Sequence, residues 1–242
     1  MSALKLFPKR IPEPKELNDL EMGVFERLGQ ANYKRWILPL VDNFIKQTRL
    51  KKGFVVDVAC GPGLLSKEIA SRNQQISVVG IDTSKIALKL ARKNTYELKN
   101  VTFKEASVYQ LPFDNNFVDA VICKDSLHHF DNLKKALTEM LRIIKPGGYL
   151  YIQDMRRDLP LYLIKRSAGL NSPIEQLQYY STRAAYTKQE VRKILSEIKV
   201  KPLLLRTQNL THRVKNRYSR LGINTTQLRE GFQARYNLVV RK

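Results

Sequence analysis

Short apolar segments alternate with segments of helical period from residue 54 onward, and this alternation limits the fold more than any other feature. The predicted strands are 54–58, 76–81, 101–104, 118–123 and 149–153, and the helices between them are 64–71, 84–94 and 133–144. Strands that alternate with helices form a parallel sheet covered on both faces. The capping box of Thr187 and Glu190 then starts another helix, and two final strands are predicted at 200–206 and 234–241. We therefore predict an α/β fold with a doubly wound sheet.

The segments outside this alternation divide the rest of the chain. Apolar residues at helical spacing predict one helix over 32–48, and residues 1–48 are expected to form a helical cover on a main domain of residues 49–242. Residues 155–186 lack a clear period, and a long segment of that kind is often functional, so we predict a lid. Residues 207–231 are polar and basic and are interpreted as an insertion before the last strand. Asp131 is the predicted cap of helix 133–144.

Charge is the unusual bulk property of the chain, with a formal net charge of +21. From Lys201 onward ten Lys or Arg residues face a single acid, Glu230. Such a balance attracts anions, which leaves RNA, an anionic membrane surface, an acidic substrate or merely a solvated surface as explanations. No apolar run approaches the roughly 20 residues of a membrane span, and the N-terminus does not resemble a signal peptide, so we expect a cytoplasmic protein. Two cysteines are too few for a disulfide framework or a cysteine-built zinc site, and no metal is expected.

The segment Val55 to Ser66 (VVDVACGPGLLS) carries the chemistry, because Gly61 and Gly63 form a turn between a predicted strand and a predicted helix. Such a turn lets backbone N–H groups and the positive helix end approach a ligand closely. Alone it is also a near match to the dinucleotide fingerprint. Asp82 ends the second strand, and its carboxylate can accept hydrogen bonds from ribose hydroxyls whichever nucleotide cofactor the loop binds. Two features favour a nucleotide cofactor other than NAD: Ser66 stands in place of the third glycine of that fingerprint, and the acid Asp57 lies four residues before Gly61.

Later blocks in the sequence decide between these interpretations: Leu111 to Asp114 (LPFD), Phe117 to Val121 (FVDAV), His128 to Phe130 (HHF) and Leu141 to Leu150 (LRIIKPGGYL). In this order the chain resembles the class I S-adenosylmethionine-dependent methyltransferases, and among them the group similar to ubiquinone/menaquinone-biosynthesis methyltransferases. The likeness covers roughly 54–153. It implies a Rossmann-like sheet of seven strands with the last antiparallel, and S-adenosylmethionine as the cofactor.

The resemblance also implies roles for individual residues. It places the loop residues around the methionine part of the cofactor, Asp82 on the ribose, and Thr83, Ser107 and Val108 near the adenine. The full predicted cofactor set is Asp57, Ala59, Cys60, Gly61, Gly63, Asp82, Thr83, Ser107, Val108 and Lys124. Two positions depart from the family pattern, since the family usually has glycine at Ala59 and aspartate at Ser107. A serine hydroxyl can accept the same bond from the adenine amino group without a charge, so affinity is expected to fall.

His128 and His129 are the candidate catalytic residues, because histidine titrates near neutrality and can act as a general base beside the methyl group. Adjacent residues in a loop point in different directions, so at most one of the two is expected to face the pocket. The alternative interpretation is structural, with one histidine packed under the loop and the other capping the next helix.

Two functional hypotheses remain open at this point. The first is methyl transfer to a small-molecule acceptor at O, C or N, with the added segments closing a pocket. The second is an RNA methyltransferase or RNA-binding protein that uses the basic C-terminal region. Against the second, Lys124-Asp125-Ser126-Leu127 lacks the prolines and aromatic residue typical of enzymes that methylate exocyclic amines of bases. A membrane-surface version of the first hypothesis, with a lipid-like substrate, also stays open. The oligomeric state is not predicted.

Overall fold

A computed structural model describes residues 9–12, 19–158, 173–207 and 235–242. In this part of the chain a seven-stranded sheet has the order β3-β2-β1-β4-β5-β7-β6. Its strands are β1 (Gly53–Val58), β2 (Ile76–Asp82), β3 (Val101–Glu105), β4 (Val118–Lys124), β5 (Ile144–Met155), β6 (Leu204–Thr207) and β7 (Arg235–Arg241). The first five are parallel, and β7 runs antiparallel to both of its neighbours, β5 and β6. The predicted doubly wound sheet with an antiparallel last strand is confirmed.

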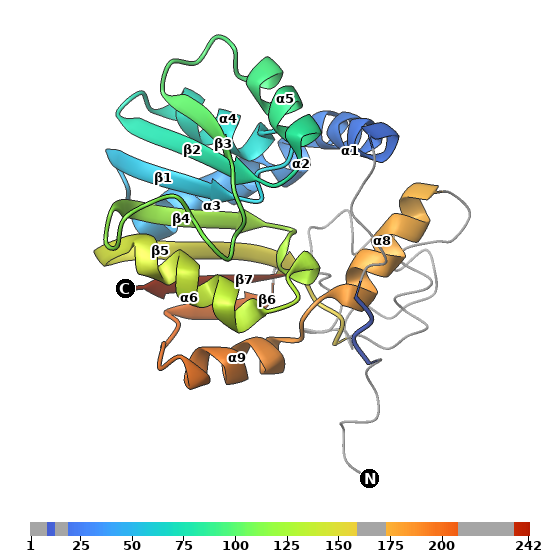
Figure 1. The fold of residues 1–242 in the computed structure, drawn as a ribbon, viewed down its shortest axis with the longest axis vertical. Coiled ribbons are helices and arrows are strands. Elements are labelled where there is room, and N and C mark those ends of the chain that lie inside the picture. Colours follow the sequence, from blue (N-terminus) through green and yellow to red (C-terminus); the bar gives the residue numbers. More distant parts are fainter. Residues whose placement is uncertain (1–8, 13–18, 159–172, 208–234) are drawn as a thin grey trace.

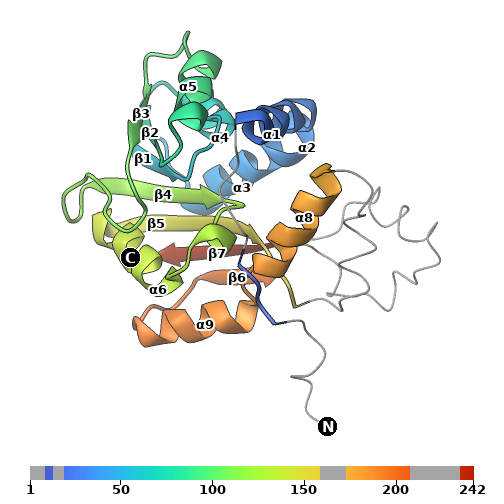
Figure 2. The ribbon, with the colours of Figure 1, turned by 45° about the vertical axis from the view of Figure 1, so that its right-hand side comes forward.

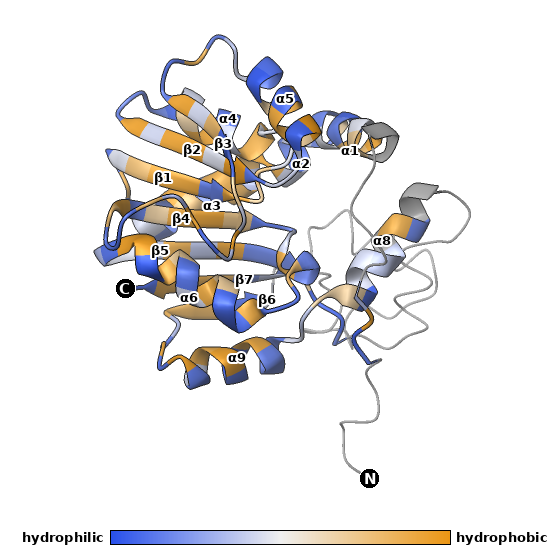
Figure 3. Ribbon diagram, in the orientation of Figure 1, coloured by the Kyte–Doolittle hydropathy of each residue, from blue (hydrophilic) through white to orange (hydrophobic). Residues whose placement is uncertain are grey.

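Helices cover both faces of the sheet (Figure 1). Helices α3 (Leu38–Thr48), α4 (Leu64–Arg72) and α5 (Lys85–Asn94) share one hydrophobic core with one face, and α6 (Leu133–Ile143) and α9 (Lys188–Glu197) share a second core with the other. Apolar residues dominate the strands between these layers (Figure 3). The strands are therefore buried on both faces, as a parallel sheet requires.

The remaining helices lie at the carboxyl ends of the parallel strands. These are α1 (Asp19–Ala31), α2 (Tyr33–Trp36) and α8 (Pro173–Ala184), with the short 3-10 turn η2 (Leu127–His129) directly after β4. Figures 1 and 2 show α1 and α8 beyond the same edge of the sheet. The strand order reverses between β1 and β4, and ligands of such folds bind outside that point of reversal. The fold therefore directs the search for a site to the ends of β1, β2 and β4.

Several local predictions need correction. Asn132, and not Asp131, caps α6: its side chain accepts a bond from the Lys135 N–H. The helix predicted over 32–48 divides into α2 and α3 because Pro39, near the start of α3, has no N–H to continue the hydrogen-bond ladder. Pairing of β6 begins only beyond Pro202. Strand β5 begins earlier than predicted because Ile144 already pairs with Val118 of β4, and Gly147 and Gly148 then bond to Lys242. The capping box at the start of α9 is confirmed.

Some predictions fall wholly or partly outside the described residues. The basic insertion at 207–231 lies there almost entirely, and so does His212. Of the predicted lid at 155–186, residues 159–172 lie there as well, and its described remainder includes α8.

Candidate functional site

The loop from β1 to α4 folds tightly because three of its residues adopt positive φ. Ala59, Gly61 and Gly63 have φ of 54°, 52° and 75°. Gly63 is required by packing, since an added Cβ would lie 2.7 Å from the Cβ of Ala91 and 3.0 Å from Phe103. Ala59 tolerates a left-handed backbone at a cost of about 1–2 kcal/mol. The loop thus keeps its shape with alanine where the family usually has glycine.

Gly61 has a different surrounding, which bears on cofactor fit. A Cβ added there would meet only the Phe25 ring of α1, at 4.0 Å, among the described residues. The Gly61 N–H donates to Asp82 Oδ2 at 2.8 Å. The positive φ of Gly61 favours glycine, and the open space beside its backbone suits the close approach of a ligand. The loop is thus a cradle that an added Cβ would fill.

Asp82 lies at the end of β2 and is held in one orientation. Its two carboxylate oxygens accept N–H bonds from Gly61 (2.8 Å) and Ser84 (2.9 Å). Each oxygen keeps a second lone pair, so the carboxylate can still accept bonds from vicinal hydroxyls. Thr83 beside it is exposed, and Ser84 caps α5. A fixed acid next to a glycine cradle matches the needs of a ribose-containing cofactor.

Asp57 lies inside the fold, with 1% of its surface exposed. Its Oδ2 accepts a 2.6 Å bond from the Ser66 hydroxyl, which ties β1 to the first turn of α4. Burial raises the pKa of Asp57 to about 7, with the Ser66 bond opposing this rise and the charge of Asp82 adding to it. Ser66, which stands where the dinucleotide fingerprint has its third glycine, thus holds the Asp57 carboxylate in place. This contact is structural, and a bond from Asp57 to cofactor stays a prediction.

The other predicted cofactor residues lie around the same edge. Cys60 and Cys123 are both buried free thiols, and burial is the main cause that raises both thiol pKa values well above the ordinary range. Ser107 follows β3, and its hydroxyl oxygen accepts the Tyr109 N–H at 3.2 Å, which leaves one lone pair for an adenine amino group. Val108 is buried in the core shared with α6. Both thiols are buried and the Ser107 hydroxyl already accepts one bond, so Gly61 and Asp82 are the best candidates for contact with a cofactor.

A partly buried charge cluster lies at the end of β4. Asp125, with φ of 49°, pairs with the Lys124 ammonium and accepts two bonds from Arg235 of β7, at 2.7 and 3.0 Å. Burial alone would raise the pKa of Asp125, but Arg235 and Lys124 together lower it below its usual range. Lys124 is therefore held by a carboxylate rather than directed freely at the site.

The two histidines differ in their surroundings. His128 is buried, and its Nδ1 lies 3.0 Å from Oδ1 of Asp154 at the end of β5. His129 is exposed, and its ring centroid lies 4.2 Å from that of His128. The two rings thus lie in contact but differ in burial, and a catalytic role of either one remains a prediction.

Three side chains of this region were missed at the level of sequence. Asp154 and Arg235 sit on strands that meet only through the sheet, and Arg10 bonds to the carbonyl oxygens of Ala184 (2.7 Å) and His128 (2.9 Å) from the N-terminal segment. Asp154 had one available signal, because it is an acid that closes an apolar strand. Arg10 and Arg235 had none, since their partners lie more than 100 residues away in the sequence.

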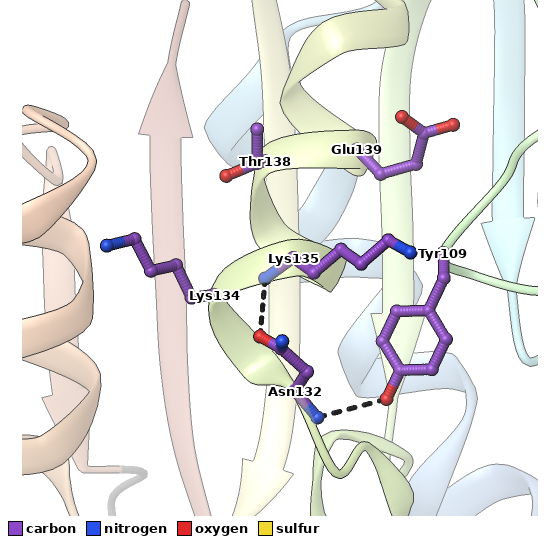
Figure 4. A pocket seen from close by; sticks show the side chains of 6 residues that line it. All are labelled: Tyr109, Asn132, Lys134, Lys135, Thr138 and Glu139. Atoms are coloured by element: carbon purple, nitrogen blue, oxygen red, sulfur yellow. Dashed lines mark hydrogen bonds between the residues drawn. The ribbon is translucent and has the colours of Figure 1, made fainter.

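A shallow cavity of about 330 Å³ lies on the outer side of α6 (Figure 4). Its walls contain none of the predicted cofactor residues; they are Tyr109, Asn132, Lys134, Lys135, Thr138 and Glu139. Among the described residues no cluster of three or more His, Cys, Asp or Glu could hold a metal ion. No described helix is both long and apolar enough to cross a bilayer.

The fold and the cradle together define a Rossmann-like protein of the seven-stranded, nucleotide-cofactor type. The model of a methyltransferase domain matches residues 56–152. A ubiquinone biosynthesis O-methyltransferase of Dechloromonas aromatica is 36% identical over 158 residues, which cover 59% of this chain and 67% of that protein. The protein of the same name from Alkalilimnicola ehrlichii is 34% identical over 45% of this chain and 44% of its own length. The chain spans about half the length of the first curated relatives it matches.

Solved structures agree on the fold. A SAM-dependent methyltransferase from Aquifex aeolicus superposes with a TM-score of 0.65 at 18% identity, covering 93% of this chain and 99% of that one. The chain belongs to the class I S-adenosylmethionine-dependent methyltransferases, in the group that includes the ubiquinone-biosynthesis enzymes. S-adenosylmethionine is the cofactor of this family, and the cradle of Gly61 with Asp82 fits it.

Proposed function

We propose that the protein transfers a methyl group from S-adenosylmethionine to a small-molecule acceptor with an O, C or N nucleophile. One observation carries the proposal: the Asp82 carboxylate is fixed by the Gly61 N–H beside a glycine whose added side chain would meet only Phe25. The loop residues would hold the methionine part and Asp82 the ribose. When bound, the cofactor supplies a methyl group made electrophilic by a sulfonium, so the protein mainly aligns the acceptor and excludes water.

The added segments support a closed site for a small acceptor. Gly29 of α1 packs against Leu64 at the start of α4, and Phe25 of the same helix lies over the glycine loop. The N-terminal segment also contacts α8, because the Ile11 N–H donates to the Arg183 carbonyl oxygen at 3.2 Å. We propose that residues 1–48 cover the cofactor side of the site and that 155–186 form the lid of the acceptor side. These contacts support a site closed by α1 and α8 around a small acceptor.

Calorimetry with S-adenosylmethionine tests the cofactor site. Asp82→Ala should weaken binding about 10- to 100-fold, since bonds to a charged acceptor are worth about 1.5–3 kcal/mol. Gly61→Ala should also weaken it, by filling the cradle. Ser107→Asp should strengthen it by restoring a charged acceptor for the adenine amino group. Asp114→Ala, which removes an exposed carboxylate outside the predicted cofactor set, is the matched control. Absence of binding heat from the wild-type protein would reject the proposal.

The competing proposal, RNA methylation or RNA binding, rests on the net charge of +21 and on a basic region mostly outside the described residues. A protein that contacts several phosphates loses affinity steeply as salt rises. Binding of a single-stranded RNA should therefore be measured over a range of salt concentrations. Weak binding with a flat salt dependence would exclude this alternative, and a steep dependence would favour it over the small-molecule acceptor.

A further inference from the structure

A second hollow, of about 340 Å³, lies where α9 ends and the chain turns toward β6. Three of the residues that line it are cations, Arg192, Lys199 and Lys201, and the described part of its wall contains no acid. Ser196 adds a hydroxyl to the same wall. Cavities that hold small ligands begin at about 300 Å³, so the hollow is large enough for a compact anion.

Neighbouring residues do not neutralise these three cations. Along the ranges that the structure describes, none of the three forms an ion pair or a side-chain hydrogen bond, and all three residues are exposed. Both acids of α9 bond to other partners: Glu190 accepts a bond from Arg157 at 2.6 Å, and Glu197 pairs with Lys134 of α6 at 3.3 Å. Like charges gathered at one hollow repel one another, and an anion from solution would relieve that repulsion.

Lys199 occupies a backbone position that glycine usually takes. Its φ is 57°, and its N–H bonds to the Ser196 carbonyl oxygen at 3.0 Å. The next N–H, of Val200, bonds to the Leu195 carbonyl oxygen at 2.8 Å. The two bonds form a Schellman motif, in which the left-handed residue is most often glycine because a Cβ is disfavoured there. A charge that is kept at a cost to the fold points to a function of the hollow.

The same two bonds remove an obstacle to an anion. The carboxyl-terminal end of a helix carries a partial negative charge on carbonyl oxygens that have no partner. In α9 the carbonyl oxygens of Leu195 and Ser196 are occupied by N–H groups, and that of Ile194 accepts the Ile198 N–H at 3.1 Å. The positive side chains are therefore the dominant charges at the hollow.

The hollow lies at the opposite edge of the sheet from the glycine loop. Strand β6 runs parallel to β5, because both are antiparallel to β7, so β6 starts at the edge where the parallel strands begin. Figure 1 shows the connection from α9 to β6 at that edge. The glycine loop instead follows the end of β1. A ligand of the hollow is therefore distinct from the acceptor of the methyl group.

We propose that this hollow is a second binding site, for a small free anion with adjacent phosphate groups, a diphosphate. The planar fork of Arg192 binds two phosphate oxygens at once, and the two ammonium groups supply compact charges beside it. The Ser196 hydroxyl donates to a further oxygen. Cations gathered around one hollow suit a ligand whose charge is concentrated, whereas a nucleic-acid strand spreads its charge along the backbone. The site does not depend on the proposed methyl transfer.

Calorimetric titration of the full chain with inorganic pyrophosphate tests the site, in a buffer of about 20 mM ionic strength where screening is weak. Lys199→Gly separates charge from fold, because glycine removes the ammonium and relieves the left-handed backbone. It should weaken pyrophosphate binding about 3-fold and raise the midpoint of thermal unfolding by about 2–4 °C. Adding Arg192→Gln and Lys201→Gln to Lys199→Gly should weaken binding at least about 10-fold.

The matched control removes the same amount of charge elsewhere. It combines three substitutions at exposed lysines of α5 and the loop after it, Lys89→Gln, Lys93→Gln and Lys99→Gln. This variant should bind pyrophosphate as the wild type does. Equal losses of affinity in the two triple variants would overturn the proposal, since net charge alone would then attract the anion.

Two further outcomes would also reject the site. Wild-type protein that gives no heat with pyrophosphate is one of them. The other is a short single-stranded RNA, or a vesicle containing phosphatidic acid, that binds through the hollow while pyrophosphate does not. Calorimetry with S-adenosylmethionine on the same samples keeps the proposed function separate. Absence of cofactor binding rejects methyl transfer alone, and absence of pyrophosphate binding rejects the second site alone.

Discussion

The buried Asp57 should make the stability of the free protein depend on pH in a way that an exposed acid cannot. Its pKa rises from an ordinary 3.8 to about 7 in the fold, mainly because of burial. Between these values the folded protein binds a proton that the unfolded chain does not. The stabilisation is complete below pH 3.8 and is lost as the pH rises through about 7.

The size of the effect follows from the same values. Linkage from a folded pKa of about 7 and an unfolded pKa of 3.8 gives a loss of about 2 kcal/mol in the unfolding free energy between about pH 5.5 and about pH 8.5. Asp57→Asn keeps the shape and an acceptor for the Ser66 hydroxyl but has no proton to titrate. Its stability should therefore fall by about 2 kcal/mol less than that of the wild type over this interval.

Urea unfolding at both pH values measures this difference, followed by the fluorescence of Trp36, the single tryptophan, and by circular dichroism. Asp114→Asn is the control, because it removes one carboxylate from an exposed turn and should keep the wild-type pH dependence. Parallel curves for wild type and Asp57→Asn would refute the reasoning, since Asp57 would then keep the same proton in the folded and unfolded states.

Three further predictions concern the loop, a cap and the N-terminal segment. Gly63→Ala should lower the unfolding free energy, measured in urea, by about 2 kcal/mol or more, because its Cβ would lie 2.7 Å from that of Ala91. Gly61→Ala should lower it by only about 1 kcal/mol. Equal losses in the two variants would contradict the roles assigned to the two glycines. Asn132→Ala should lower the unfolding free energy by about 1 kcal/mol through loss of the α6 cap, whereas Asp131→Ala should leave it almost unchanged. Thermal unfolding that reverses this order would show that Asp131 is the cap. Arg10→Ala should lower stability by about 1–2 kcal/mol, and Arg10→Lys should not restore it, since lysine lacks the planar fork that reaches both carbonyl oxygens while lying over the Tyr186 ring. Full rescue by lysine would show that charge alone matters.

Local patterns were sufficient to predict the part of the site that we propose binds the cofactor. Gly61, Gly63 and Asp82 lie on consecutive elements, so the turn and the strand end that position them are encoded within about 30 residues of sequence. The same was true of the sheet, because β-strand and helix periods alternate without ambiguity between 54 and 153. The resemblance to known methyltransferases then supplied roles that spacing alone left open between two nucleotide cofactors.

The contacts on the proposed acceptor side could not be predicted in this way. Asp125 pairs with Arg235 across 110 residues, and Arg10 reaches the His128 carbonyl across 118. Only the antiparallel insertion of β7 beside β5 brings the first pair together. A neighbouring cap was also misplaced, since Asp131 and Asn132 are both good N-caps and sequence gives no reason to choose the second.

The family match and the proposed acceptor side of the site involve different parts of the chain. The family match covers 56–152 and therefore contains the glycine loop, Asp82 and His128, but it ends before Asp154. Three further elements also lie outside the match: Arg10 donates to the His128 carbonyl, Arg235 donates to the Asp125 carboxylate, and α8 lies close to η2. We propose that these segments outside the match shape the acceptor side of the site. Relatives that match only within 56–152 therefore support methyl transfer and do not identify the molecule that receives the methyl group.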